Sequence, residues 1–458
     1  MQLRTWQTRC VNEALRCYDF QSHFMCLATP GAGKTVMAAT LAARLMDLKK
    51  IDFILCFSPS IEVNESIKIT FTKIFNRRFD GLLGALGGIY TYQSMSSFSS
   101  EFWQLLKSSK VLIILDEVHH LKGSELCNAN AWGEEVLLNI QNQAAYTLAL
   151  SGTPWRSDQA PIVLSRFTEP DNTIHCDFVY GLQEAVANGV CRKPNIVLID
   201  NDKIELGTTK GSKVFNSIAE LLTQTKFSYQ SLINNTQIVH YILRQCVQKL
   251  DELRYENPRA GGLVVASSIQ HAMELYRILK SDFKQSACIV TSNLKNTSTI
   301  IDTYRNNTTQ WIVSVGMISE GTDVPRLQVC CHLSRIRTEM HYRQVLGRIL
   351  RISDNAKQAW LFTLAESALI DFANRIGHDL PDYPVVFAQN ENQKLNLELS
   401  NTECDIDVIE ETNVLSLSEN KSLSILKHAQ KLTDLEEENQ FNLALLGGYK
   451  EKLINMII

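Results

Sequence analysis

The feature that most restricts the fold of this chain is a glycine-rich segment, Ala28-Thr-Pro-Gly-Ala-Gly-Lys-Thr35. The apolar run Met25-Cys-Leu precedes it, as expected of a buried strand, and an alanine-rich amphipathic pattern over Thr35–Leu48 follows, as expected of a helix. A glycine loop that joins a strand to a helix N-terminus is the context that a phosphate-binding loop requires. The segment therefore predicts an α/β domain with an anion site at this loop.

The residue types in the loop indicate how it would hold a nucleotide. Gly31 and Gly33 can adopt backbone angles closed to other residues, so that successive N–H groups point at one anion. Lys34 is expected to reach the β- and γ-phosphates, and the Thr35 hydroxyl to hold Mg²⁺. The general pattern has glycine where Ala28 stands, so the match departs at one position. The expected nucleotide-binding residues of the loop are Pro30, Gly31, Ala32, Gly33, Lys34 and Thr35.

Short apolar, β-branched runs alternate with amphipathic segments along most of the chain. This alternation is typical of parallel strands covered by helices, and it occurs twice, which predicts two doubly wound α/β domains. The expected strands are Ile51–Phe57, Val111–Leu115, Thr147–Leu150, Gly262–Ala266, Ala287–Thr291, Gln310–Val315 and Gln328–Leu333, with helices that include Ile269–Lys280 and Met340–Leu350.

Changes in composition predict four segments. The first α/β domain is expected over residues 1–199, and a linker with a helical connector over 200–258. The second α/β domain is expected over 259–388, and a partly helical tail over 389–458, where leucines recur at helical spacing in Ser422–Asn439. The tail is expected either to dock on the body or to bind a protein partner.

Charge and cysteine content restrict the partners and the compartment. The formal net charge is −4, but residues 389–458 hold 13 acidic and 6 basic residues, so the body is mildly basic. That distribution permits local contact with a phosphate backbone. The 12 cysteines lack the spacing of a zinc or iron–sulfur site, which favours reduced thiols in a cytoplasmic protein. Because we find neither an apolar leader nor a run of 18 apolar residues, we expect no membrane association.

A second polar cluster, Asp116-Glu-Val-His119, follows the apolar run Val111–Leu115. A buried strand that ends in two acids delivers carboxylates to the edge of the sheet where α/β domains bind ligands. We expect Asp116 to bind Mg²⁺ through water and Glu117 to polarise the attacking water. His119 is expected to link this site to the second domain or to the following loop. With the glycine loop, these acids predict an enzyme that hydrolyses ATP with Mg²⁺.

Further motifs follow in order: Leu3-Arg-Thr-Trp-Gln7 at the N-terminus and Ser151-Gly-Thr153-Pro after the strand Thr147–Leu150. The series resembles that of the superfamily 2 helicases, in particular the DEAD/DEAH-like group. That group includes the XPB-type helicases and the motor subunits of type I and type III restriction enzymes. The resemblance implies two tandem RecA-like domains, an adenine contact by Gln7, and coupling of hydrolysis to movement by Ser151 and Thr153.

The second half of the chain continues the resemblance. Glu320-Gly321-Thr-Asp323-Val-Pro325 looks like motif V, with Gly321 and Asp323 at the nucleotide, and Gln344-Val-Leu-Gly-Arg348-Ile-Leu-Arg351 looks like motif VI. On a helix, Gln344, Arg348 and Arg351 share one face. Two arginines directed at a γ-phosphate held by the other domain would be arginine fingers.

The expected nucleic-acid contacts rest on position alone. Hydroxyl residues follow several strands, where they could hold phosphates without reading bases, and each could equally cap a helix. The residues in question are Ser58, Pro59, Ser60, Thr91, Ser267 and Thr291.

These expectations combine into an ATP-dependent helicase or translocase that moves along nucleic acid, with DNA favoured over RNA by the resemblance. The alternative is the motor subunit of a restriction or anti-phage defence complex. Such a subunit would translocate on duplex DNA without unwinding it and would serve a partner nuclease.

Overall fold

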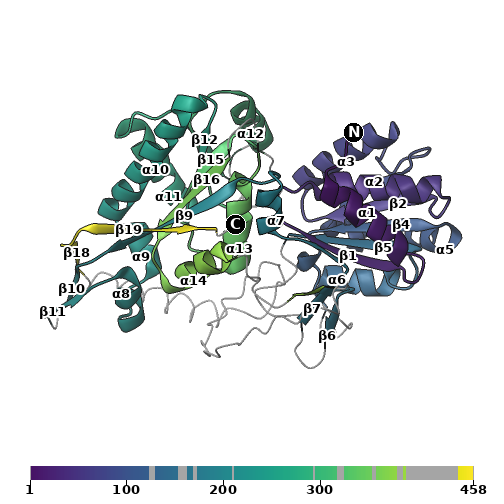
Figure 1. Cartoon of the computed structure of the whole chain (residues 1–458), viewed down its shortest axis with the longest axis horizontal. Coiled ribbons are helices and arrows are strands. Elements are labelled where there is room, and N and C mark those ends of the chain that lie inside the picture. The colour runs from purple at the N-terminus through teal and green to yellow at the C-terminus, as the bar shows by residue number, and fades with distance from the viewer. Residues whose placement is uncertain are drawn as a thin grey trace, which may run out of the picture.

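A computed structural model gives the structure of the chain (Figure 1). It describes residues 2–122, 129–152, 162–168, 173–208, 211–291, 294, 296–316, 324–352, 357–378, 385–387 and 442–456. The elements form two lobes, each built on a sheet with helices on its faces, and the N-terminal half of the chain makes the lobe at the right of Figure 1.

The first lobe is built around a six-stranded sheet of order β3-β2-β4-β5-β1-β8, in which every pair of neighbours is parallel. Its strands are β1 His23–Ala28, β2 Phe53–Ser58, β3 Gly87–Thr91, β4 Val111–Asp116, β5 Tyr146–Ser151 and β8 Phe178–Tyr180; β6 Arg166–Thr168 and β7 Thr173–Cys176 lie outside it. Its helices are α1 Thr5–Cys17, α2 Lys34–Asp47, α3 Ile61–Phe75, α4 Ser100–Trp103, α5 Leu105–Ser108, α6 Ala131–Glu135 and α7 Leu182–Ala187, with short turns η1 Tyr92–Ser97, η2 Val118–His120 and η4 Val136–Ile140.

The second lobe is built around a seven-stranded sheet of order β13-β14-β12-β15-β16-β9-β19, parallel except for β19 at its edge. Its strands are β9 Lys193–Asn201, β12 Gly261–Val265, β13 Ala287–Val290, β14 Trp311–Ser314, β15 Leu327–His332, β16 Gln358–Leu364 and β19 Tyr449–Asn455. Its helices are α8 Ile218–Gln224, α9 Tyr229–Ile233, α10 Thr236–Glu256, α11 Ile269–Ser281, α12 Thr297–Asn306, α13 Glu339–Ile349 and α14 Ser367–Gly377.

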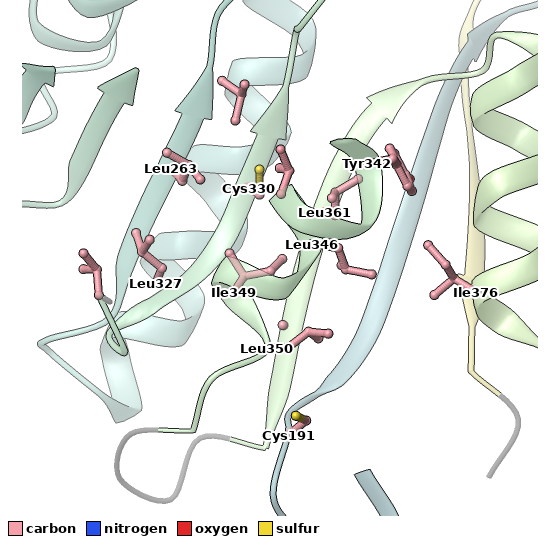
Figure 2. Close-up of a cluster of buried hydrophobic side chains, with 14 of the residues drawn as sticks. Cys191, Leu263, Leu327, Cys330, Tyr342, Leu346, Ile349, Leu350, Leu361 and Ile376 are labelled. Carbon is pink, nitrogen blue, oxygen red and sulfur yellow. The ribbon is translucent and has the colours of Figure 1, made fainter. Parts of the chain in front are cut away.

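Apolar side chains from both faces of each sheet make the cores. The expected strands are all present, and except for the partly buried edge strand β13 their apolar runs are buried on both faces, as is typical of parallel strands. In the second lobe, Tyr342, Leu346 and Ile349 of α13 pack beside Cys330 of β15 and Leu361 of β16 (Figure 2). This packing fixes the helix on which motif VI stands.

The expected segment limits differ from the sheets in two places. Residues 193–199 were expected to close the first domain, but β9 pairs with β16 over seven residues and so belongs to the second sheet. The first part of the expected linker segment 200–258, the polar stretch Asp200–Lys213, instead contains β10 Ile204–Thr208 and most of β11 Gly211–Phe215, which form a hairpin. Ile204 and Leu206 of β10 and Phe215 of β11 are buried, but the polar residues around them do not by themselves distinguish this hairpin from a linker.

The end of the chain also differs from the expected helical tail. β18 Asn442–Leu445 pairs with β10, and β19 pairs antiparallel with β9. β17 Val385–Phe387, expected in the second domain, pairs with β7. The expected helix over 422–439 lies outside the described residues. Of the helices that the structure describes, none combines the length and apolar character needed to cross a bilayer.

Candidate nucleotide-binding and hydrolysis site

The glycine loop connects β1 to α2 at the carboxyl edge of the first sheet, as the sequence predicted. Gly31 and Gly33 have φ angles of 83° and 95°, a region that favours glycine. A Cβ atom at Gly33 would lie 2.9 Å from Nε2 of Gln7, and one at Gly31 would lie 3.0 Å from Cγ of Arg351. Glycine is therefore needed at both positions, because of the positive φ angles of the turn and because the side chains of Gln7 and Arg351 lie so close.

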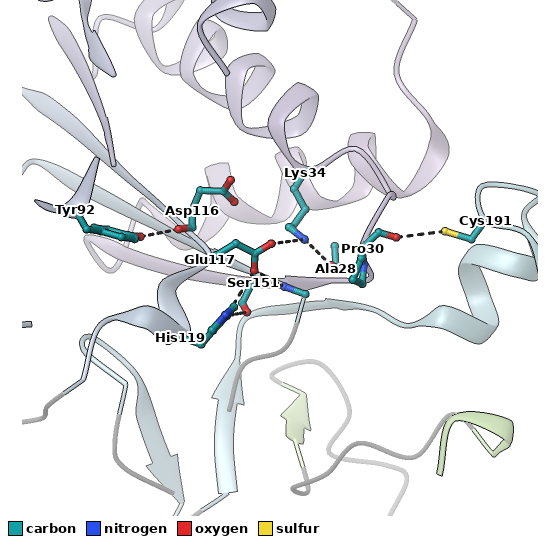
Figure 3. Close-up of polar contacts among 10 residues, drawn as sticks. Ala28, Pro30, Lys34, Tyr92, Asp116, Glu117, His119, Ser151 and Cys191 are labelled. Atoms are coloured by element: carbon teal, nitrogen blue, oxygen red, sulfur yellow. Dashed lines mark hydrogen bonds and ion pairs between the residues drawn. The ribbon is translucent and has the colours of Figure 1, made fainter. Parts of the chain in front are cut away.

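Lys34 and Glu117 meet across the loop (Figure 3). The Lys34 ammonium lies 3.6 Å from Oε1 of Glu117 and donates a hydrogen bond of 3.2 Å to the carbonyl of Ala28. In the sheet, β4 and β1 flank β5, so their carboxyl ends bring the acids, Ser151 and the loop together. Glu117 has a φ angle of 52°, an uncommon conformation for a residue other than glycine.

Both oxygens of the Glu117 carboxylate have neighbours. Oε2 accepts a hydrogen bond of 3.4 Å from the Gly152 amide and lies 3.5 Å from Nδ1 of His119. His119 is buried, and its Nδ1 atom lies 3.0 Å from Oγ of Ser151. The expected coupling residues His119 and Ser151 thus contact each other, and His119 also contacts the acid. Thr153 lies outside the described residues.

The two acids have opposite electrostatic settings. Burial raises the pKa of Asp116, and the neighbouring Glu117 carboxylate adds to that rise. Burial alone would also raise the pKa of Glu117, but the Lys34 ammonium, the imidazoles of His119 and His120, and the Gly152 amide lower it below its usual value. Glu117 is therefore ionised at neutral pH, and a divalent cation beside Asp116 would offset the desolvation of that carboxylate.

Gln7 ties the N-terminal helix to the loop. Its Oε1 atom accepts from the Arg4 amide at 2.8 Å, and its Nε2 atom donates to the Gly33 carbonyl at 2.9 Å. Arg4, which we had not assigned to the site, donates through Nη1 to the Ala32 carbonyl at 2.6 Å. The side chain of Gln7 is buried and borders the loop, and its expected contact with adenine stays a prediction.

Motif VI of the second lobe meets the glycine loop of the first. A Cβ atom at Gly347 of α13 would lie 2.6 Å from Cβ of Pro30, and Arg351 approaches Gly31 as described above. The thiol of Cys191 donates to the Pro30 carbonyl at 3.7 Å (Figure 3). The two lobes are therefore in contact at the loop itself.

Gln344 and Arg348 stand on α13, both partly exposed, at the spacing that places them on one face. Arg351, expected on the same helix face, instead lies two residues beyond the end of α13, in a bridge with Cys191. Gly321 and Asp323 of the expected motif V lie outside the described residues. The loop, the acids and Arg351 are thus brought together, while the nucleotide contacts of motif V remain an expectation.

The expected nucleic-acid contacts divide by burial. Ser58 is buried, and its hydroxyl lies 2.7 Å from the side-chain amide of Asn64, whose N–H group donates to it. Ser267 is buried beside Nδ1 of His271 at 2.9 Å. Thr291 is also buried. Ser60 caps α3, as the alternative reading of these hydroxyls proposed. Partly exposed positions are found at Pro59, Ser60 and Thr91.

Two further residues, Tyr92 and Cys191, lie at the site although no sequence motif indicated them. The Tyr92 hydroxyl donates to the Asp116 carbonyl at 2.7 Å and so fixes the end of β4. Cys191 is buried against the glycine loop, with Arg4, Lys34, Arg351 and Arg192 close enough to influence its thiol. This concentration of cations around the loop fits a polyphosphate, and the acids opposite fit its magnesium ion.

Comparison with protein families agrees with this geometry. Residues 1–156 match the family described as type III restriction enzyme, res subunit, and residues 245–353 match the helicase conserved C-terminal domain. The chain belongs to the superfamily 2 helicases, in the ResIII-like group. The two lobes of this superfamily 2 chain are its tandem RecA-like domains.

Two individual proteins illustrate the relationship. An uncharacterized protein of Mycobacterium leprae is 26% identical over 82% of this chain and 64% of its own length. The DNA 3′-5′ translocase XPB2 of Sulfurisphaera tokodaii is 23% identical over 81% of this chain and 83% of its own. The superfamily 2 chain spans less than two thirds of the mycobacterial protein.

Among solved structures, a fragment of a putative HsdR subunit of a type I restriction enzyme from Vibrio vulnificus superposes with a TM-score of 0.58. It is 17% identical, and the match covers 83% of this chain and 67% of that one. At this identity the likeness establishes the fold.

Proposed function

We propose that this superfamily 2 chain hydrolyses ATP with Mg²⁺ where its two lobes meet, and that it uses the cycle to move along nucleic acid. The observation that carries the proposal is the contact of Gly347 and Arg351 with the glycine loop. A nucleotide held by that loop would touch both lobes, so its turnover would be coupled to their relative movement.

The first lobe supplies the groups that would hold and activate the reactants. Lys34 would exchange its contact with Glu117 for the β- and γ-phosphates, and Thr35 and Asp116 would hold Mg²⁺. That release would leave Glu117, anchored by the Gly152 amide and beside His119, to orient the attacking water and accept its proton. Bound Mg²⁺ would neutralise phosphate charge.

The second lobe would complete the site. Arg351 already lies at the glycine loop, two residues beyond the end of α13, and Gln344 and Arg348 stand on α13. We propose that Arg348 and Arg351 stabilise charge on the transferred phosphoryl group, with Gly321 and Asp323 of motif V at the nucleotide. Gln7 would contact the adenine, and His119, Ser151 and Thr153 would couple hydrolysis to movement.

DNA is the proposed track, because the translocase of S. tokodaii is named as acting on DNA. Contacts through Ser60 and Thr91 would be independent of base sequence. Buried Ser58, Ser267 and Thr291 would contribute only if their loops move, or through main-chain groups. Within the acidic segment 389–458, β18 and β19 pair with strands of the body, and the part before β18 is proposed to contact a protein partner. A cytoplasmic location stays a prediction.

The test is ATP hydrolysis measured side by side with single-stranded DNA, duplex DNA and RNA, with and without Mg²⁺. We expect Mg²⁺-dependent hydrolysis that rises several-fold with DNA. Equal rates with and without every polynucleotide would contradict the proposal that the ATPase is a nucleic-acid motor.

A second candidate is the motor subunit of a restriction or defence complex that moves on duplex DNA without unwinding it. The match to the res subunit family favours this candidate. Displacement of a triplex-forming oligonucleotide without separation of a forked duplex would support it. Separation of the fork by the chain alone would favour the helicase.

A further inference from the structure

The chain passes from one lobe to the other at Cys191 and Arg192. The Cys191 amide donates to the Ala185 carbonyl of α7 at 3.1 Å, and the next amide, that of Arg192, donates to the Leu350 carbonyl at 2.8 Å. α7 is joined to the first lobe through the ion pair of Glu184 with Arg9 at 2.9 Å. Two successive amides are therefore bound to opposite lobes, which places the crossing between these two residues.

Arg192 is fully buried at this crossing, with an exposed fraction of 0%. Its guanidinium donates through Nη1 to the Leu327 and Ile349 carbonyls, the second at 2.9 Å, and through Nη2 to the Pro325 carbonyl at 2.9 Å. A buried cation must recover its lost hydration through hydrogen bonds, and a planar fork can reach several carbonyls at once. Arg192 therefore joins the start of β15 to the end of α13.

The acceptors on α13 lie at its C-terminal end. α13 ends at Ile349, and the last carbonyls of a helix have no partner within the helix. The Arg192 side chain binds the Ile349 carbonyl and its main chain binds that of Leu350, while a cation at this end also complements the helix dipole. Ile349 and Leu350 are the two residues between Arg348 and Arg351.

The same crossing reaches the glycine loop. Cys191 forms a bridge with Arg351 in the manner of antiparallel strands, and its thiol contacts the Pro30 carbonyl. Figure 2 shows Cys191 beside Leu350 at the end of α13. A shift of the crossing would thus displace the backbone that carries Arg348 and Arg351 relative to the loop.

We propose that Arg192 is a positioning residue that sets the geometry of Arg348 and Arg351 at the glycine loop, acting through the Ile349 and Leu350 carbonyls. This inference rests on the proposed ATPase function. Pro325, which Arg192 also holds, ends the expected motif V, so one side chain fixes the ends of both motifs of the second lobe.

The chain offers a matched control in Arg326. It is also buried, at 4% exposure, and it also binds three carbonyls: Arg259 at 2.7 Å, Tyr304 at 3.1 Å and Thr309 at 2.7 Å. None of these acceptors belongs to α13. Both Arg192→Lys and Arg326→Lys remove a buried guanidinium that binds several carbonyls. Only Arg192→Lys also removes a hydrogen bond to the end of α13.

The first measurement is kcat and KM for ATP in both variants at a temperature where each is folded. Arg192→Lys should lower kcat on the order of 10- to 100-fold, as expected when reacting groups are misplaced, and change KM little. Arg326→Lys should lower the melting temperature and keep kcat within about twofold of wild type. If Arg192→Lys does not fold, Arg192→Gln takes its place. Wild-type kcat in a folded variant would overturn the proposal.

The second measurement tests the route through the arginines. In an Arg351→Lys background, Arg192→Lys should cost much less kcat than it does in the wild type, because the group it positions has already been impaired. An equal fold-loss in both backgrounds would mean that Arg192 acts elsewhere.

A third measurement does not depend on ATP. Hydrogen exchange of residues 340–352 should be faster in Arg192→Lys than in wild type, and unchanged in Arg326→Lys. Unchanged exchange in both would overturn the support of α13 by Arg192. A wild-type chain that hydrolyses no ATP would instead defeat the proposed function, and the exchange result would still decide what Arg192 holds.

Discussion

Lys34 and Glu117 form an ion pair, but their proposed roles differ once a nucleotide binds: Lys34 would bind phosphate, and Glu117 would orient the attacking water. In the structure the ammonium lies between the Ala28 carbonyl and the Glu117 carboxylate. Phosphate oxygens would compete for the same ammonium with more charge. The two residues should therefore fail differently when each is replaced.

Lys34→Ala should weaken binding of ATP by about 10- to 100-fold, the effect of losing a charged hydrogen bond, and abolish detectable hydrolysis. The measurement is the Kd for ATP by calorimetry together with the hydrolysis rate. Lys107, an exposed lysine of the same lobe, supplies the control Lys107→Ala. Normal binding and turnover in Lys34→Ala would remove this residue from the site.

Glu117→Gln should keep ATP binding and lower kcat on the order of 10²-fold or more, because the amide preserves shape but cannot accept a proton. The pKa of Glu117 lies below its usual value, so a rise in activity with pH through the neutral range should not originate from this carboxyl group. Single-turnover hydrolysis measures the effect, with exposed Glu101→Gln as control. A rate close to that of wild type would refute the assignment.

Arg348→Ala and Arg351→Ala should each lower kcat on the order of 10³-fold while Kd for ATP changes far less, since arginine fingers act most strongly in the transition state. Lysine should substitute poorly, because a point charge does not replace a planar fork. Arg277→Ala, on the exposed face of α11, is the matched control. Wild-type turnover in both variants would mean that the second lobe does not complete the site.

At this scale the sequence predicted the residues whose role depends on a local pattern. The glycine loop, Asp116 with Glu117, and motif VI each follow from neighbours within a few positions. Arg192 and Cys191 could not be predicted, because their partners, Ile349 and Pro30, are distant in sequence and meet them only after both lobes have folded. No local pattern distinguishes such a residue from an exposed one.

Among the helices and strands too, a local sequence pattern predicts some elements, whereas others depend on partners that are distant in sequence. β1, β2, β4, β5 and β12 to β15 could be predicted from their apolar runs. The parallel strands β3, β8, β9 and β16 were not among the expected strands. β19 could not, because it is an edge strand with mostly exposed side chains, and its stabilising partner β9 lies about 250 residues earlier. Its sequence, Tyr449-Lys-Glu-Lys-Leu-Ile-Asn455, is therefore read locally as part of an acidic tail.

Removal of residues 447–458 should lower the melting temperature by at least about 5 °C. It would expose the edge of β9, remove the stack of Tyr449 on Tyr241 at 3.8 Å, and uncover the surface under Met456. An unprotected edge also promotes association, so light scattering should rise on heating. Removal of only the last two residues is the control. An unchanged melt in the longer truncation would show that β19 contributes little to the second lobe.

On the scale of the whole molecule, the second lobe should be more sensitive to acid because it contains three buried histidines. Burial lowers the pKa of His271 to about 4, of His332 to about 3 and of His341 to about 4. The rings of His332 and His341 lie 5.8 Å apart, and His341 adds to the lowering at His332.

The direction of the effect follows from where protons bind. An unfolded chain takes up protons on histidine below about pH 6.5, whereas these three histidines stay neutral in the folded lobe down to about pH 4. Acid therefore favours the unfolded state. Above about pH 6.5 the three histidines are neutral in both states and cause no loss of stability. Between about pH 6.5 and pH 4, each of them lowers the free energy of unfolding by about 1.4 kcal/mol per pH unit.

Denaturant melts between pH 7.5 and 4.5 would measure this loss, and hydrogen exchange would assign it to a lobe. We expect the second lobe to lose protection at a higher pH than the first. His332→Gln should reduce the pH dependence, even if it lowers the stability at pH 7.5, because the protonatable group is gone. His378→Gln, at an exposed histidine, should leave the dependence unchanged. If His332→Gln kept the full pH dependence, His332 would not be a source of the acid sensitivity. The acid would then act through carboxyl groups, which are present in each lobe, and the two lobes would be expected to unfold over the same pH range.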